Sequence, residues 1–111
     1  MTNHYIPEKG DMVWIDFDPS TGMEIQKRRP ALVISRRNFN AATKFAVVCP
    51  ITSTEIDLPT RYSLSENYKT KGQIVIHQMK SLDFNKRKID FIEKMNHVDM
   101  KKIEQVIGFI I

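Results

Sequence analysis

The sequence has very little cysteine: Cys49 is the one thiol among 111 residues. A single thiol excludes an internal disulfide, and no metal-ligating residue stands near it in the sequence. Because Cys49 lies in the apolar stretch 45–50, we interpret it as a small buried side chain. The chain also lacks internal repeats, linkers and low-complexity segments, so we predict one domain over residues 1–111.

Long hydrophobic runs are absent as well. The longest apolar run, near the C-terminus, is broken by charges every few residues and is too short to span a bilayer. No apolar segment follows a basic start, as a secretory signal requires, so we expect a cytoplasmic protein with no membrane partner. The formal charge of +4 and the pI near 9.3 permit a nucleic-acid partner without requiring one.

The motifs of many enzymes are missing. His4, His77 and His97 lie far apart and no CxxC or HxxxH pairing is present, so the sequence predicts no metal site. It also contains no GxSxG motif, no P-loop and no dinucleotide fingerprint. These absences disfavour hydrolases built on those motifs, and we predict no bound cofactor.

The sequence does contain a series of short strand-like segments. In residues 12–17, Val13, Ile15 and Phe17 alternate with Trp14 and Asp16, which is typical of a strand with one buried face. We predict further strands at 31–35, 45–51, 60–64, 73–79 and 89–92, a turn or short helix at 36–43, and a corner at 81–84.

The pattern changes after residue 96, where apolar residues recur at helical spacing. They predict a C-terminal helix with one apolar face and are Met100, Ile103, Val106, Ile107 and Ile110. Several short strands, long loops and one terminal helix together indicate a mainly β fold with α: a small, strongly bent β-barrel or sandwich.

The loop between the first two predicted strands is too long for a tight hairpin and is rich in charge. Its charged residues are Asp16, Asp18, Glu24, Lys27, Arg28 and Arg29. Arg29 comes directly before Pro30, which biases it toward an extended backbone at the exit of the loop. Its guanidinium matches phosphate oxygens, and an ion pair with a loop carboxylate is the ordinary alternative.

Two other residues are candidates for chemistry. Thr52 follows Pro50 at the end of the third predicted strand, and its hydroxyl either hydrogen-bonds a phosphoryl oxygen or caps a turn. Glu24 either accepts a proton, orients Arg29 or is simply solvated. These residues alone leave the alternatives open.

Three blocks of sequence occur in a specific order. The first reads Gly10-Asp11-x-Val13-Trp14-x-Asp16-Phe17-Asp18-Pro19, then Gly22-x-Glu24, then Arg29-Pro30-Ala31-x-Val33-Ile34-Ser35. The second is Pro50-Ile51-Thr52, and the third is Gln78-Met79-Lys80-Ser81-Leu82-Asp83. Together, over the full length of the chain, they resemble the MazF/PemK/Kid family of toxin endoribonucleases.

The resemblance implies an SH3-like or CcdB-like β-barrel that forms a homodimer. It also implies the toxin of a type II toxin-antitoxin system, which cleaves single-stranded RNA such as mRNA at short sequences without a metal and is silenced by a MazE-like antitoxin. In the family, the arginine of Arg-Pro and the threonine of Pro-x-Thr are catalytic. They correspond to Arg29 and Thr52, with Glu24 as a supporting residue. The ribose 2′-hydroxyl would attack the adjacent phosphorus, leaving a 2′,3′-cyclic phosphate and a 5′-hydroxyl.

One position departs from the family. Many relatives have an acidic residue directly before the strand glutamine, where this chain has His77. A histidine titrates near neutrality, so His77 either acts as a general acid or base or only packs or contacts RNA. The general base therefore stays open between Glu24, Arg29 and His77. The candidates for RNA binding beside the site are Lys27, Arg28, Gln78 and Lys80.

Two other functions are consistent with the same fold. One is a non-catalytic toxin similar to CcdB, which would poison DNA gyrase through its C-terminal helix. Glu24, the Arg29-Pro30 pair and Thr52 argue against it, because a gyrase binder needs no residues for phosphoryl transfer. The other is a degenerate family member that binds RNA or a partner without cleaving.

Overall fold

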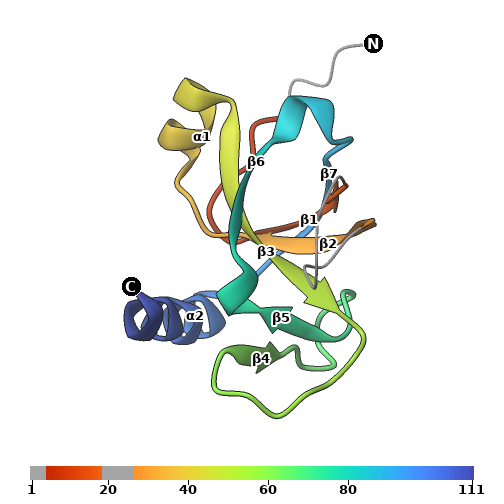
Figure 1. The fold of residues 1–111 in the computed structure, drawn as a ribbon, viewed down its shortest axis with the longest axis vertical. Coiled ribbons are helices and arrows are strands. Elements are labelled where there is room, and N and C mark those ends of the chain that lie inside the picture. Colours follow the sequence, from red (N-terminus) through yellow and green to blue (C-terminus); the bar gives the residue numbers. More distant parts are fainter. Residues whose placement is uncertain (1–4, 19–26) are drawn as a thin grey trace.

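Seven strands and two helices are formed by the residues that the structure describes. The computed structural model describes residues 5–18 and 27–111 (Figure 1). The elements are β1 (Asp11–Asp16), β2 (Arg28–Val33), α1 (Arg37–Thr43), β3 (Phe45–Thr52), β4 (Arg61–Ser63), β5 (Gln73–Val75), the 3-10 turn η1 (Ile76–Gln78), β6 (Lys80–Asp83), the 3-10 turn η2 (Phe84–Lys86), β7 (Asp90–Lys94) and α2 (His97–Ile110).

The strands form one bent antiparallel sheet in the order β4-β5-β3-β2-β1-β7, and β6 pairs with the first half of β3. Within the described residues β4 pairs only with β5, and β7 only with β1. The predicted mainly β fold with a terminal helix is confirmed. The sheet stays open, however, where the sequence predicts a barrel, because its two end strands are short and do not meet.

β3 is the long central strand, and it changes partner along its length. Residues 45–48 pair with β6, whereas Ile51 and Thr52 pair with β5. Pro50, which has no N–H to donate, lies between these two ladders. The 3-10 turn η1 takes up the offset between β5 and β6 on this edge of β3. The ladder on this edge of β3 is therefore interrupted around Pro50.

Two predicted elements need correction for the same reason. The strand predicted at 73–79 ends at Val75, because the chain must turn there to move from the second ladder of β3 to the first. Residues 81–84, predicted as a corner, belong mostly to β6, which forms the first ladder. Three β-branched residues in a row favour a strand but do not reveal where its partner changes.

Alternate residues of the central strands face two separate cores. The helix-side core lies against α2 and includes Met12, Leu32, Cys49, Ile51, Ile74, Ile76, Met100 and Ile103. The β-core lies on the other face and includes Val13, Ile15, Phe17, Ala31, Val33, Ala46, Val48 and Leu82. Burial raises the pKa of the Cys49 thiol to about 12, which agrees with its predicted role as a small buried side chain.

α2 covers the helix-side core with the predicted apolar face. Met100 and Ile103 are buried, whereas Lys101 is exposed. The helix begins after Asn96, whose side-chain oxygen accepts a hydrogen bond from the Asp99 N–H at 2.8 Å, a standard N-cap. No helix in the described part of the chain is long and apolar enough to cross a membrane.

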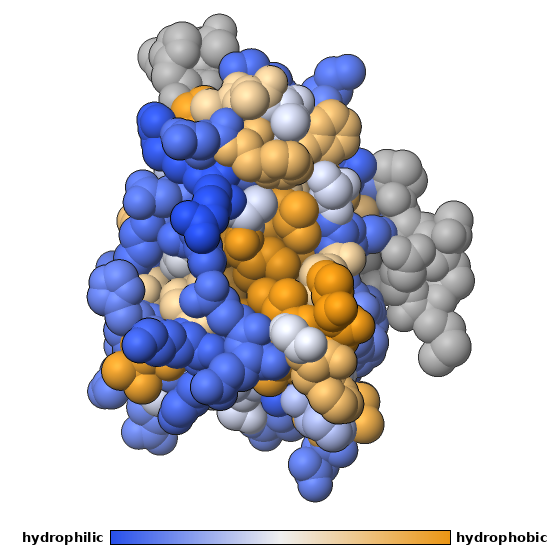
Figure 2. All heavy atoms as spheres, turned by 90° about the vertical axis from the view of Figure 1, so that its left-hand side faces the viewer, coloured by the Kyte–Doolittle hydropathy of each residue, from blue (hydrophilic) through white to orange (hydrophobic). Residues whose placement is uncertain are grey.

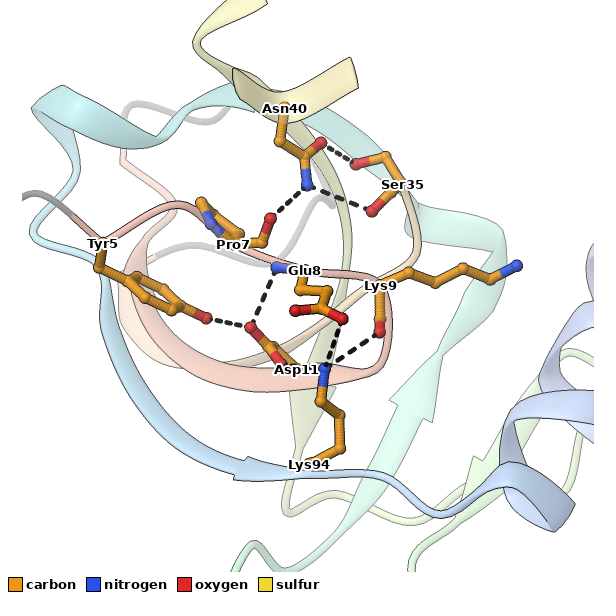
Figure 3. A network of polar contacts seen from close by, with 8 residues as sticks. All are labelled: Tyr5, Pro7, Glu8, Lys9, Asp11, Ser35, Asn40 and Lys94. Atoms are coloured by element: carbon orange, nitrogen blue, oxygen red, sulfur yellow. Dashed lines mark hydrogen bonds and ion pairs between the residues drawn. The ribbon is translucent and has the colours of Figure 1, made fainter. Parts of the chain in front are cut away.

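A polar cluster fastens the N-terminal segment to the sheet (Figure 3). The carboxylate of Asp11, only 3% exposed, accepts hydrogen bonds from the Tyr5 hydroxyl and from the Glu8 N–H at 3.0 Å. The ammonium of Lys94 lies 2.8 Å from its other oxygen. Burial, together with the bond to Asp11, raises the pKa of Tyr5, which keeps the phenol protonated as a donor. We call Tyr5, Glu8, Asp11 and Lys94 the N-terminal clasp.

Candidate functional site

Four neighbouring strands contribute a row of polar side chains across the sheet. β2 pairs with β3 in a register that sets Ala31 against Pro50, and continuing this register by two residues sets Arg29 against Thr52. Thr52 is paired with Gln73 of β5, which is paired with a serine of β4. The row thus crosses β2, β3, β5 and β4, and we call it the polar row: Arg29, Thr52, Gln73 and Ser63.

Arg29 and Thr52 share a face and an end of the sheet. Opposed residues on antiparallel strands point to the same face, and both residues lie on the β-core face, since Arg29 is two residues from Ala31 and Thr52 is four from Val48. They lie half-buried where β2 begins and β3 ends. The Thr52 hydroxyl accepts a hydrogen bond from the Thr54 N–H at 3.3 Å and, within residues 5–18 and 27–111, donates none. Its proton is therefore available to an oxygen of a bound molecule.

Gln73 and Arg61 hold the loop that follows Thr52. The side-chain oxygen of Gln73, a residue only 7% exposed, accepts from the Ile56 N–H at 3.0 Å and from Arg61 Nη1 at 3.2 Å. The same Nη1 donates to the Thr54 carbonyl at 2.8 Å. We call Arg61 and Gln73 the loop brace, because their bonds fix the backbone next to the Thr52 hydroxyl.

A glycine allows the chain to approach the end of β3 closely. Gly72 has φ +119°, and a Cβ built on it would lie 2.2 Å from the carbonyl oxygen of Thr52. That distance is far inside van der Waals contact, and L residues rarely adopt this backbone conformation. Any side chain at position 72 would therefore push Thr52 out of place.

Two of the predicted RNA-binding residues, Lys80 and Gln78, lie further along β3 from the polar row and are not part of it. Lys80 of β6 pairs with Val48, four residues before Thr52 on β3 and on the same face of the sheet. Four residues of strand span roughly 13 Å. Gln78 lies half-buried at the end of η1, just before Lys80. Their positions suit contacts with a bound chain further along the sheet.

The other two predicted RNA-binding residues lie elsewhere. Arg28 alternates with Arg29 and so points to the opposite face, where its Nη2 lies 2.8 Å from the Asp90 carboxylate of β7. Lys27 has φ +71°, and its N–H donates to the Asp18 carboxylate at 2.9 Å. The structure therefore does not bring Arg28 into the polar row, and it gives Lys27 a turn-forming role.

His77 lies away from the Arg29–Thr52 end of the sheet. Its Nδ1 is 2.7 Å from the hydroxyl of Thr60, the residue directly before β4 in the sequence. The His77 side chain is exposed. Along the chain it follows Gln73, the residue opposite Thr52, by four positions, of which Ile74 and Val75 belong to β5 and the next two to η1. The two strand residues span roughly 7 Å, and the 3-10 turn adds about 4 Å. The structure thus does not place His77 with Arg29 and Thr52.

Glu24, the predicted supporting residue, lies outside the described residues, as does the rest of segment 19–26. In the described part of the chain, no group of three or more His, Cys, Asp or Glu side chains is arranged to hold a metal ion. The chemistry that the described site offers is therefore that of a guanidinium and a hydroxyl donor.

The sequence did not single out Gln73, Ser63 or Arg61. One signal for them was present, because Arg61 and Ser63 alternate with Tyr62 in the short strand β4. Gln73 is a polar residue at the start of an apolar strand and is nevertheless buried. Their importance depends on the strand order β4-β5-β3-β2, which local alternation does not predict.

Known proteins match this chain over nearly its whole length. The family model described as PemK-like, MazF-like toxin of type II toxin-antitoxin system matches residues 8–111. The endoribonuclease toxin MazF of Escherichia coli K12 is 33% identical over 87 residues, which is 78% of each chain. Crystal structures of Deinococcus radiodurans MazF alone and of its MazE-MazF complex superpose with TM-scores of 0.91 and 0.84. Each is 28% identical and covers 96% of both chains.

Proposed function

The chain belongs to the family of PemK-like and MazF-like toxins of type II toxin-antitoxin systems, and we propose that it is an endoribonuclease that cuts single-stranded RNA. The observation that carries the proposal is the β2–β3 register, which pairs Ala31 with Pro50 and, continued by two residues, brings Arg29 opposite Thr52. Relatives named as endoribonucleases support the same activity, and no observation favours the gyrase-binding alternative. We further propose that it acts on mRNA in the cytoplasm.

The proposed reaction is attack of a ribose 2′-hydroxyl on the adjacent phosphorus. The bond to the 5′-oxygen of the next nucleotide breaks, which leaves a 2′,3′-cyclic phosphate and a 5′-hydroxyl. Negative charge builds up on the phosphoryl oxygens in the transition state. The Arg29 guanidinium and the Thr52 hydroxyl would stabilise this charge, and one such donor contributes about 3–4 kcal/mol. A requirement for the 2′-hydroxyl would also restrict cleavage to RNA.

We assign Arg29 to charge stabilisation rather than to proton transfer. Arginine keeps its proton at any physiological pH and is therefore a poor base. Lys80 and Gln78, which continue along the same side of β3, would bind the RNA on one side of the cut. Such phosphate contacts make binding sensitive to salt.

The test uses a long RNA incubated with the purified protein in EDTA, followed by mapping of the new 5′ ends. We expect discrete cuts that carry 5′-hydroxyls. Arg29→Ala and Thr52→Ala should each lower the rate about 100-fold or more. Arg37→Ala and Thr43→Ala, matched changes on and beside the exposed α1, should leave it unchanged. RNA that stays intact with the unaltered protein would refute the proposed activity.

We propose that two copies associate through the face that carries α1 and α2. Figure 2 shows a broad apolar patch on this side of the molecule. Ile111 and Phe109 at the C-terminus are 87% and 75% exposed. A pocket of about 380 Å³ beside them is lined by Lys9, Ile34, Met100, Glu104, Ile107, Gly108 and Ile111. Exposed apolar patches of this kind usually mark a protein interface.

Sedimentation velocity tests the homodimer. The unaltered protein should sediment as a dimer and Ile111→Glu as a monomer. Leu58→Glu, at an exposed apolar residue in the loop after β3, is the matched control and should remain a dimer. A monomeric unaltered protein at micromolar concentration would contradict the assembly. The cleavage assay tests the proposed activity independently of this result.

We also propose a MazE-like antitoxin as the inhibitory partner, by analogy with the relatives solved as MazE-MazF complexes. An antitoxin segment that lies in an extended conformation over the polar row would exclude RNA by occupancy.

A further inference from the structure

A pocket lies on the opposite face of β2 from Arg29. Its volume is about 390 Å³, and it is lined by Trp14, Pro30, Lys69, Thr70, Lys71 and Ile92. Trp14, the one tryptophan in the sequence, is 42% exposed there. The polar row makes no use of this pocket.

The register of the strands explains why the pocket exists. Trp14 of β1 is paired with Pro30 of β2 and, two residues from Met12, lies on the face of β1 that carries the helix-side core. The helix-side core includes Tyr68 of the loop after β4 but does not include Trp14. The indole and the proline ring thus form an apolar floor that remains open to solvent.

The loop that forms one wall is held firmly in place. The Glu93 carboxylate of β7 accepts hydrogen bonds from the Lys69 N–H at 3.1 Å, the Thr70 N–H at 2.7 Å and the Thr70 hydroxyl at 2.8 Å. Burial would raise the pKa of Glu93, but these hydrogen bonds outweigh it and hold that pKa below its usual value. Glu93 therefore remains an ionised acceptor, and the pocket is preformed.

The rim of the pocket is positively charged. Lys69 is exposed, and the ammonium of Lys71 donates to two backbone carbonyls, at 2.7 Å and 3.1 Å, which leave its charge uncompensated. Of the two nearby carboxylates, Asp90 is paired with Arg28, and the charge of Glu93 offsets that of Lys69, which leaves Lys71 as the excess positive charge at the rim. An apolar floor with a cationic rim fits an apolar side chain carried on an acidic peptide.

We propose that this pocket anchors an apolar side chain of an acidic segment of the cognate antitoxin. The proposal rests on the proposed function, because it assumes a toxin with an antitoxin partner. RNA is the less suitable occupant, since a strand bound at Arg29 and Thr52 would run along the other face of β2. The antitoxin would thus hold the toxin at a point separate from the cleavage chemistry.

Fluorine NMR tests the proposal directly. Arg29→Ala protein labelled with 5-fluorotryptophan has one fluorine, at Trp14, and does not degrade RNA under the proposed function. Addition of the antitoxin encoded with this toxin should shift the resonance. Addition of a single-stranded RNA with deoxyribose at the cleavage position should leave it in place. A shift with the RNA alone would make the pocket an RNA subsite, and a shift with neither would also overturn the proposal.

Binding measurements on variants separate this pocket from the active site. Trp14→Ala should weaken antitoxin binding at least about tenfold, as expected for a buried aromatic anchor, while RNA cleavage stays within about twofold. Phe91→Ala is the matched control, because Phe91 is 51% exposed on β7 but lies outside the pocket. It should change neither property. Equal antitoxin binding by Trp14→Ala and Phe91→Ala would overturn the proposal.

A charge reversal keeps the test valid if Trp14→Ala fails to fold. Lys69→Glu changes an exposed side chain and should weaken antitoxin binding about tenfold in low salt, with a smaller effect in high salt. Lys101→Glu, on the exposed side of α2, is its control. No difference between these two variants would contradict an acidic partner at this rim. If the unaltered protein does not cleave RNA, that result would instead refute the proposed function.

Discussion

The N-terminal clasp and the polar row are both polar clusters on the same sheet, but they differ in how fully the fold uses their hydrogen-bonding groups. Asp11 of the clasp is buried, and three donors occupy its two oxygens. The Thr52 hydroxyl of the polar row is half-buried and, in the described part of the chain, receives one bond and donates none. A buried cluster whose polar groups are paired within the fold stabilises it, whereas one with an open donor can bind a ligand.

This difference divides the first sequence block into two roles. Gly10-Asp11 belongs to the clasp: Gly10 has φ +94°, and its N–H and carbonyl join β2 to the end of β7. Arg29-Pro30 belongs to the site, with Arg29 in the polar row and Pro30 in the pocket on the other face. Changes in the two clusters should therefore affect different measurements.

The largest expected effect is on stability. Asp11→Ala leaves the Tyr5 hydroxyl and the Glu8 N–H without their acceptor and removes the nearest carboxylate from the Lys94 ammonium, so we expect the free energy of unfolding to fall by about 3–5 kcal/mol. Urea denaturation measures this change, with Asp57→Ala in the exposed loop after β3 as the control. RNA cleavage per folded molecule should stay unchanged. A large loss of cleavage in the folded fraction would remove the distinction between the two clusters.

The next effect is on activity alone. Thr52→Val keeps a β-branched side chain at the end of β3 but removes the hydroxyl, so we expect cleavage to slow about 100- to 1000-fold. Thr52→Ser, which keeps the donor, should retain most of the rate. The urea midpoints of both variants should match that of the parent closely. Equal rates for the valine and serine variants would show that the hydroxyl takes no part in the reaction.

A smaller loss of activity is expected at the loop brace. Gln73→Ala removes the acceptor for the Ile56 N–H and for Arg61, which frees the loop after Thr52. We expect kcat to fall about tenfold with little change in KM, because positioning of the Thr52 hydroxyl matters most in the transition state. Gln73→Glu keeps the acceptor and should recover part of kcat. A change in KM alone would instead make Gln73 a binding residue.

The sequence predicts more of the fold than of the site. Alternation in residues 12–17 and helical spacing after residue 96 predict β1 and α2 correctly, because each pattern is local. The ends of β5 and β6 were missed because they depend on the partner that β3 offers. Arg29 and Thr52 came from the family resemblance. The roles of Gln73 and Arg61 could be recognised only from the strand order. The position of Arg28 became clear from the strand register, and that of His77 from its contact with Thr60.

A third cluster, at the start of α2, should behave like the clasp but more weakly. The Asp99 carboxylate accepts from the Tyr62 and Tyr68 hydroxyls and joins α2 to the β4 region. Burial would raise the pKa of Asp99, but these bonds outweigh it and hold that pKa below its usual value. Its contribution is therefore fully present above the unfolded pKa of about 3.9 and is lost as the pH falls through the lower folded pKa.

Asp99→Asn should thus lower the free energy of unfolding by about 1 kcal/mol at pH 7. The difference from the parent should shrink as the pH falls below about 4, since the parent then loses the same charge. Urea denaturation at several pH values measures both quantities, with Asp57→Asn in the exposed loop after β3 as the control. A difference that grows on acidification would contradict a lowered pKa in the folded state.

The smallest expected effect, none at all, is at His77. Its ring is hydrogen-bonded to the Thr60 hydroxyl. It lies beyond the far end of β5 from Gln73, the residue paired with Thr52. A general base must lie within hydrogen-bond reach of the 2′-hydroxyl whose proton it removes. We therefore expect the pH–rate profile of His77→Gln to match that of the parent in both limbs. Loss of one limb would instead identify His77 as the base and bring it into the site alongside Thr52.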